Sequence, residues 1–228
     1  MEYGSLVHPY CKRMRNTSTL LLLIIIQIQC FSQKTLTSDS DTCSYFREHY
    51  YQFLDQLNIP KLQDLEADFA FRFWDGRKFI QLIEKDNKLE GTLFFVLQEY
   101  ATVDDERYYQ SQQILDSTQA IQIKNLVLDL GIHNIPTEDQ IEGWRNGFDG
   151  YTYLLETVDF DSYSIKSYWS PEIFHELKEA RLLVYFMNEL NLMDVVIESN
   201  KKFMKHQPFK SYYVHIGGIT IATVLRRW

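Results

Sequence analysis

The sequence predicts an α+β fold, with a mostly antiparallel sheet of about six to seven strands packed against two to three helices. Three observations support this prediction. Runs of alternating apolar and polar residues are separated by turn-forming pairs, and other segments repeat apolar residues at helical spacing. The chain also contains 15 Tyr and 15 Phe, and aromatic side chains suit the pleated surface of a sheet.

The first predicted β unit is a meander that begins at residues 69–74, where Phe and other residues alternate. Asp75-Gly76 follows, and this pair between two alternating runs predicts a hairpin with a type I′ turn. Asp86-Asn87 predicts the next turn. The predicted strands of the meander cover residues 69–74, 79–83, 89–100 and 108–115. The last is Gln-rich and therefore suited to a sheet edge or to a solvent-facing surface.

The remaining segments alternate helix and strand signals. Helices are predicted over residues 42–57, 117–131, 137–143, 170–190 and 193–205, with Ser117, Thr137 and Ser170 as caps. A second hairpin is predicted over residues 151–158 and 163–169. Residues 212–225 predict a final β segment in which Gly217-Gly218 forms a bulge or kink.

Three ranges divide the chain. We expect a signal peptide over residues 1–32, a flexible leader over residues 33–43, and one globular domain over residues 44–228. The signal begins with a basic segment, continues with a short apolar core and ends with small residues, which is the layout recognised by the export machinery. Its apolar core is about nine residues long, whereas a membrane-spanning helix needs roughly 20, so no membrane span is expected.

Two alternatives concern this segment. Lipidation at Cys30 would anchor the protein, but Gln29 and Gln27 are poor matches to the residues that usually precede a lipidated cysteine. Met14 is an alternative start, because the residues after it already form a short complete signal. Residues 31–33, Phe-Ser-Gln, resemble the end of signals in small exported proteins of Bacteroidetes-like bacteria, which implies a periplasmic or extracellular location and no particular activity.

The net charge and the number of cysteines each exclude one class of protein. The formal net charge is −8, and removal of three basic and one acidic side chains with residues 1–32 leaves −10. An acidic domain repels nucleic acid, so no nucleic-acid partner is expected. Only Cys43 remains after cleavage, so the domain depends on its apolar core rather than on an internal disulfide.

The candidate ligand-binding residues surround a glycine-rich turn. They are Trp144, Arg145, Asp149, Tyr151, Glu156 and Trp169. In this hypothesis Arg145 holds a carboxylate in a bidentate manner, and Asp149 and Glu156 act as an acid and base pair. The alternative for Asp149 is a local role in the turn through its own backbone bonds.

Two further patterns each have a functional and a structural interpretation. Trp74, Tyr151, Tyr168, Trp169 and Trp228 would serve as a stacking surface for a sugar or peptide, or as core residues. His175 and Glu179 would share one face of a helix, but a zinc-binding helix requires a second histidine in place of Glu179. Nucleophile-elbow, phosphate-loop and dinucleotide motifs are missing, so we assign no catalytic residue, metal or cofactor.

Three functions remain open. The favoured interpretation is an exported, non-catalytic domain that binds an unidentified protein or small ligand. The second is a hydrolase that uses the Asp149/Glu156 or His175/Glu179 side chains. The third is an acidic inhibitor or immunity-type protein that neutralises a basic enzyme through its surface charge.

Overall fold

The computed structural model describes residues 35–38, 41–100, 107–145, 147, 150–216 and 219–224, with side chains described between residues 47 and 213. The chain divides into a unit of residues 1–33 and a unit of residues 34–228. The first unit holds the predicted signal, Met14 and Cys30 and lies outside the described residues. No helix of the described part is long and apolar enough to cross a membrane.

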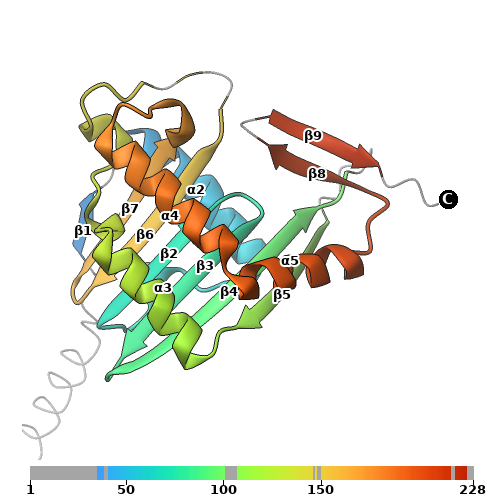
Figure 1. Ribbon diagram of the computed structural model, residues 1–228, viewed down its shortest axis with the longest axis horizontal. Coiled ribbons are helices and arrows are strands. Elements are labelled where there is room, and N and C mark those ends of the chain that lie inside the picture. Colours follow the sequence, from blue (N-terminus) through green and yellow to red (C-terminus); the bar gives the residue numbers. More distant parts are fainter. Residues whose placement is uncertain are drawn as a thin grey trace, which may run out of the picture. The chain divides into compact units, whose positions relative to one another are not determined.

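A seven-stranded sheet forms the centre of the described fold (Figure 1), with the strand order β1-β7-β6-β2-β3-β4-β5. Six strands pair antiparallel, and only the edge strand β1 runs parallel to its neighbour. The strands are β1 (Thr35–Ser38), β2 (Phe69–Trp74), β3 (Lys78–Lys85), β4 (Lys88–Gln98), β5 (Tyr108–Ile114), β6 (Thr152–Asp159) and β7 (Ser162–Trp169). The predicted meander and second hairpin are confirmed, as is the edge position of β5.

Helices cover both faces of the sheet, which confirms the α+β class. The described α-helices are α2 (Asp41–Gln56), α3 (Ser117–Asp129), α4 (Lys178–Leu192) and α5 (Asp194–His206). Figure 1 shows α3 and α4 crossing one face and α2 lying behind the sheet. Because strand side chains alternate between faces, Phe71 and Phe73 of β2 join the core under α3 and α4, whereas Ala70 and Trp74 join the core under α2.

The two hairpin turns of the meander differ in their geometry. Asp86 and Asn87 both have positive φ (51° and 61°), as a type I′ turn requires. In the first turn Asp75 and Lys78 close the hairpin through a backbone hydrogen bond of 3.0 Å, so its central residues are Gly76 and Arg77. Of these two only Gly76 has positive φ (80°). The predicted hairpin is confirmed, but the type I′ assignment at Asp75-Gly76 is wrong.

Several helix starts also differ from the prediction. Asp116, rather than Ser117, caps α3 and forms a capping box with Gln119. Thr137 precedes only the short 3-10 helix η4 (Glu138–Gln140) and makes no capping bond. Ser170 likewise precedes a 3-10 helix, η5 (Pro171–Ile173), and its Oγ accepts a hydrogen bond from the Tyr151 N–H. The expected helix from Ser170 therefore begins at Lys178 as α4.

At both ends of the domain the observed elements differ from the predicted ones. The range predicted as a leader contains β1 and the start of α2. At the other end, the predicted β segment is a hairpin of β8 (Ser211–Ile216) and β9 (Ile219–Val224). Gly217-Gly218 between them lies outside the described residues. The hairpin connects to the end of β4 through a Tyr100 N–H to Ser211 carbonyl hydrogen bond of 3.0 Å.

Candidate functional site

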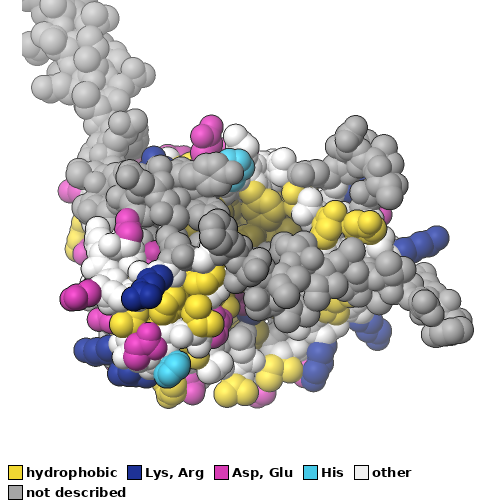
Figure 2. Space-filling view, turned by 90° about the horizontal axis from the view of Figure 1, so that it is seen from above, with side chains coloured by type: hydrophobic (Ala, Val, Ile, Leu, Met, Phe, Trp, Pro, Cys, Tyr) yellow, Lys and Arg dark blue, Asp and Glu magenta, His cyan; other side chains and the backbone are white. Residues whose placement is uncertain are grey.

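An aromatic cavity of about 250 Å³ opens where the β2–β3 turn, the end of β4 and the starts of β5 and β6 meet. Figure 2, which looks down on the molecule from above the view of Figure 1, shows hydrophobic side chains gathered in a hollow. The residues that line the cavity come from six regions of the sequence: Phe53, Trp74, Gly76, Arg77, Val96, Gln98, Tyr108, Tyr151 and Tyr213. The sheet order brings the strand residues together, and α2 and β8 add Phe53 and Tyr213.

Edge-to-face contacts hold the aromatic wall in place. Phe53 of α2 meets Trp74 at 5.0 Å between ring centroids and Tyr108 at 5.3 Å, with interplanar angles of 83° and 79°. Such pairs are each worth about 0.5–1.5 kcal/mol beyond the burial of their area. The rings therefore form a pre-ordered surface and lose little entropy when a ligand binds.

Gly76 allows Tyr151 to reach the cavity. A Cβ atom built on Gly76 would lie 1.9 Å from the Tyr151 hydroxyl oxygen, so a side chain at this position would displace the phenol. Burial, followed by the charge of Asp75, raises the pKa of Tyr151 well above its ordinary value, against a hydrogen bond with Trp74 that lowers it. Tyr151 is consequently a neutral phenol at physiological pH.

Arg77 supplies the positive charge of the cavity. Its side chain is half-buried, and no described carboxylate lies within ion-pair distance of its guanidinium. The adjacent Asp75 is instead paired with the Lys78 ammonium group, and its Oδ1 accepts the Lys78 N–H at 3.2 Å. Burial is the main effect on Asp75 and raises its pKa, while Lys78 acts in the opposite direction.

Trp144 and Trp169 lie together in a packing cluster rather than in this cavity. The Trp144 indole N–H donates to the Trp169 carbonyl oxygen at 3.0 Å, and both rings contact Phe174. A Cβ at Gly147 or Gly150 would lie within 2.3 Å of the Trp169 ring. Gly147 and Gly150 therefore pack directly against Trp169, and this close packing explains why both positions are glycine.

Arg145 does not reach the aromatic cavity. Arg145 is exposed and is absent from the cavity lining. Asp149 lies outside the described residues, so its pairing with Glu156 and its alternative turn role stay predictions. Of the five candidate residues that the structure describes, only Tyr151 lines the cavity.

Glu156 lies beneath α2 and belongs to a buried network of polar side chains. Its carboxylate accepts hydrogen bonds from Arg72 Nη1 at 2.9 Å, the Tyr50 hydroxyl at 2.7 Å and the Tyr163 hydroxyl at 2.8 Å. Arg72 and Glu156 are each 1 % exposed. A carboxylate enclosed in this way stabilises a buried arginine and has no path to a ligand.

The hypothesis of a hydrolase that uses His175 and Glu179 required both residues to lie on one helix, and that helix begins later than predicted. His175 lies before the first residue of α4, so it does not share a helical face with Glu179. Its side chain is 87 % exposed. Among the described residues no group of three or more His, Cys, Asp or Glu side chains is placed to hold a metal ion. Cys43 lies in α2, and its side chain is outside the described set.

Sequence reasoning missed most of the cavity. Arg77 follows the recognised Asp75-Gly76 pair, and Tyr108 starts a recognised strand, but neither was assigned a role. The available signal was topological: in a meander, alternate strand ends meet at one edge of the sheet. Trp74 and Gln98 end their strands at the edge where Tyr108 begins the next one.

Comparison of the chain with protein-family models, with curated proteins and with solved structures found no match.

Proposed function

We propose that this domain is exported and binds a small ligand without turning it over, by inserting one ring-bearing, negatively charged group of the ligand into the aromatic cavity. The observation that carries the proposal is the set of five aromatic side chains and one half-buried arginine around a single hollow. The export part rests on the layout of residues 1–32, which places the encounter with the ligand in the periplasm or outside the cell.

The size of the cavity favours a single ring. Its volume of about 250 Å³ is just below the range of roughly 300–1,000 Å³ for pockets that enclose drug-sized ligands. The ring planes of Trp74 and Tyr108 are nearly perpendicular to that of Phe53. An inserted aromatic ring therefore has both stacking and edge-to-face partners.

Arg77 favours an anionic substituent on that ring. A guanidinium group matches the planar geometry of a carboxylate and forms two parallel hydrogen bonds with it. Gln98 and Tyr151 add neutral hydrogen-bonding groups to the same wall. A ring with a carboxylate on a short arm therefore satisfies the apolar and the charged parts of the cavity together.

The chemistry of the lining supports binding rather than turnover. Among the described residues that line the cavity there is no carboxylate, histidine, cysteine or serine, and the nearby Asp75 carboxylate is paired with Lys78, so the lining offers no nucleophile beside a base. The Tyr151 phenol, whose pKa is raised by burial, is suited to donating a hydrogen bond and unsuited to accepting a proton.

A titration with three related probes tests the proposal. We expect 4-hydroxyphenylacetate to shift the backbone amide signals of Val96 and Gln98 in two-dimensional NMR spectra. Its neutral alcohol counterpart, which lacks the carboxylate, and 4-hydroxycyclohexylacetate, which lacks only the aromatic character of the ring, should each bind about tenfold more weakly, because each loses one interaction worth about 1–2 kcal/mol.

Two arginine variants form the matched control. Arg77→Gln should abolish the preference for the carboxylate over the alcohol, whereas Arg145→Gln, the same change of charge outside the cavity, should leave it intact. If no probe gives saturable shifts at Val96 and Gln98, or if Arg145→Gln alone removes the preference, the cavity is not the binding site.

A further inference from the structure

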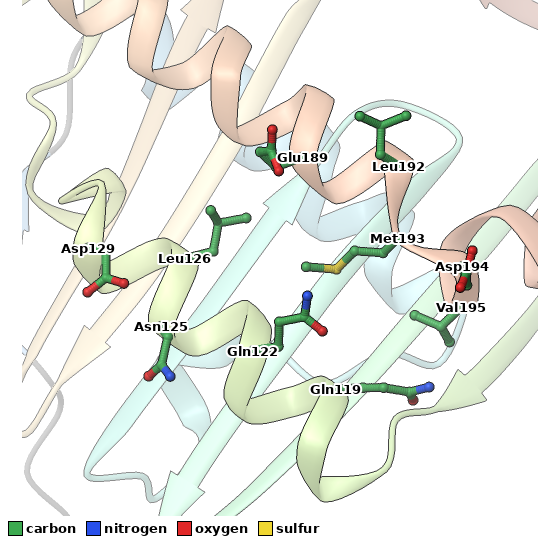
Figure 3. Close-up of a pocket in the computed structure, with 10 residues that line it drawn as sticks. All are labelled: Gln119, Gln122, Asn125, Leu126, Asp129, Glu189, Leu192, Met193, Asp194 and Val195. Carbon is green, nitrogen blue, oxygen red and sulfur yellow. The ribbon is translucent and has the colours of Figure 1, made fainter.

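A second hollow lies on the helical face of the sheet, between α3 and the junction of α4 with α5 (Figure 3). It has a volume of about 630 Å³. Figure 3 shows Leu126 on α3 and Glu189 on α4, and Met193 and Gln122 pointing into the space between the helices. We call this hollow the helix groove; its lining residues are Gln119, Gln122, Asn125, Leu126, Asp129, Glu189, Leu192, Met193, Asp194 and Val195.

The floor of the helix groove is apolar and accessible. Leu126, Met193 and Val195 are half-buried, and Leu192 is 69 % exposed. A leucine this exposed at the C-terminal end of α4 contributes little to the core. It gains its full transfer free energy, about 1.5–3 kcal/mol for a leucine side chain, only if another surface covers it.

The charged lining residues of the helix groove are all acidic. They are Asp129 at the end of α3, Glu189 in α4 and Asp194 at the start of α5. No described lysine or arginine lines the groove, and none forms an ion pair with these three carboxylates. Figure 3 shows the three side chains around the apolar floor, with Asp129 and Asp194 at opposite ends.

We propose that the helix groove binds a basic amphipathic helix of a partner protein. A helix laid between two helices buries one apolar stripe and places its flanking residues over the two rims. Leu126, Met193 and Leu192 provide the apolar contact, and Asp129 and Glu189 lie where the flanking lysines or arginines of the partner would be. Since α3 has 13 residues, the groove offers about 20 Å of length, or roughly four turns of the bound helix.

Charge and packing argue against a second copy of this chain as the occupant. The formal net charge of −8 makes two copies repel each other. The basic helix available within the chain, α5, already uses its apolar residues Val196 and Phe203 in the core of its own domain. A partner with a cationic helix is therefore the better match to this surface.

A designed peptide provides the test. The probe is an amphipathic helix of leucine and lysine of about four turns, with a leucine and glutamate peptide of the same pattern as its counterpart. Measured by fluorescence anisotropy with the full domain, the lysine peptide should bind saturably and the glutamate peptide should not bind. The triple variant Asp129→Asn/Glu189→Gln/Asp194→Asn should weaken binding about tenfold, as expected for loss of three exposed charge pairs, and Leu192→Ser should weaken it about threefold or more.

The matched control removes three carboxylates on the other face of the sheet. Asp55→Asn/Asp64→Asn/Glu90→Gln changes the net charge by the same amount and should leave the affinity unchanged. Equal weakening by both triple variants would mean general attraction to an acidic protein, and would overturn the proposal, as would the absence of saturable binding. Sedimentation that shows self-association abolished by the groove variant would assign the groove to a second copy instead. Because the ring probes test the aromatic cavity separately, either proposal can fail alone.

Discussion

Arg72 and Glu156 illustrate how a residue's chemistry depends on its surroundings. In the sequence, Glu156 is one of several acidic residues near a turn, and a catalytic role was a reasonable hypothesis. In the structure it is the counter-ion of Arg72, which also donates to Gln81 Oε1 and to the Pro60 carbonyl oxygen. Burial alone lowers the pKa of Arg72, but Tyr50 and Glu156 outweigh it and raise the pKa above its ordinary value. The guanidinium therefore stays charged, and its contact with Glu156 is structural.

Removal of this buried counter-ion should be costly. Glu156→Ala leaves the Arg72 guanidinium buried without a charge partner, and we expect it to lower the free energy of unfolding by about 3–5 kcal/mol. Urea denaturation followed by circular dichroism measures the change. The double variant Arg72→Met/Glu156→Leu, which replaces the pair by apolar groups, should recover most of the loss.

The exposed pair of Lys85 and Glu66 serves as the comparison, since both side chains are at least half exposed. Glu66→Ala should change the free energy of unfolding by less than about 1 kcal/mol. A similar small effect for Glu156→Ala would contradict a structural role for the buried pair.

At the scale of the element, the β2–β3 turn connects backbone geometry to the aromatic cavity. Gly76 and Gly131 both have positive φ, at 80° and 64°. They differ in their surroundings, because a Cβ at Gly131 meets nothing within 4 Å, whereas a Cβ at Gly76 would overlap the Tyr151 ring. One glycine is required by conformation alone, and the other by conformation and by close packing.

Alanine at these two positions separates the two requirements. Gly131→Ala should destabilise the fold by about 1–2 kcal/mol, the cost of an L-residue in the left-handed region. Gly76→Ala should cost at least about twice as much, because displacement of Tyr151 adds strain of about 1–3 kcal/mol. It should also weaken binding of the ring probe, which Gly131→Ala should not do. Equal losses of stability for the two variants in thermal denaturation would show that the contact with Tyr151 is unimportant.

At the scale of the whole molecule, buried titratable groups shape the response to alkaline pH. Burial is the largest effect on Tyr50, Tyr51 and Tyr163 and raises the pKa of each, that of Tyr51 to about 12. Burial also lowers the pKa of Lys166, which is 6 % exposed, to about 8. Its ammonium group donates to the His133 carbonyl oxygen at 2.8 Å, and no described carboxylate pairs with it.

These shifts predict a maximum of stability near pH 10. Between about pH 8 and pH 10.5 the unfolded state holds the Lys166 proton that the folded state has released, so stability rises by on the order of 2–3 kcal/mol. Above about pH 10 the unfolded tyrosines lose protons that the folded ones retain, so stability falls as pH rises through the folded pKa values. Denaturant titrations from pH 7 to pH 11.5 measure both the rise and the fall of stability, and the tyrosinate absorbance of the buried tyrosines should appear together with unfolding.

Lys166→Met tests the rise of stability with pH separately from the fall. The variant should be more stable than the parent at pH 7 and should show no rise between pH 8 and pH 10, while the fall above pH 10 stays unchanged. A parent protein whose stability declines steadily from pH 7 would contradict the assignment of a depressed pKa to Lys166.

Local signals predicted most of the elements and few of the site residues. The strands of the meander, the second hairpin and the helices α2, α3 and α5 were predictable because side-chain alternation, helical spacing and turn residues act over a few positions. The start of α4 was not, because Ser170 uses its hydroxyl to bind the Tyr151 N–H rather than to cap a helix. The edge pairing of β1 was also missed, since a parallel contact with β7 leaves no local signal.

By itself, the sequence determined the α+β class, the antiparallel meander and the acidic charge of this protein, since these follow from composition and short-range pattern. Only the tertiary structure decided that Glu156 is a buried counter-ion, that Trp144 and Trp169 pack under a glycine-rich turn, and that Tyr151 shares a cavity with Arg77. The physical reason is that burial and long-range neighbours set the chemistry of a side chain. The packing of α2 and of the β8–β9 hairpin against the sheet, which brings together residues as far apart as Phe53 and Tyr213, is a property of the whole fold.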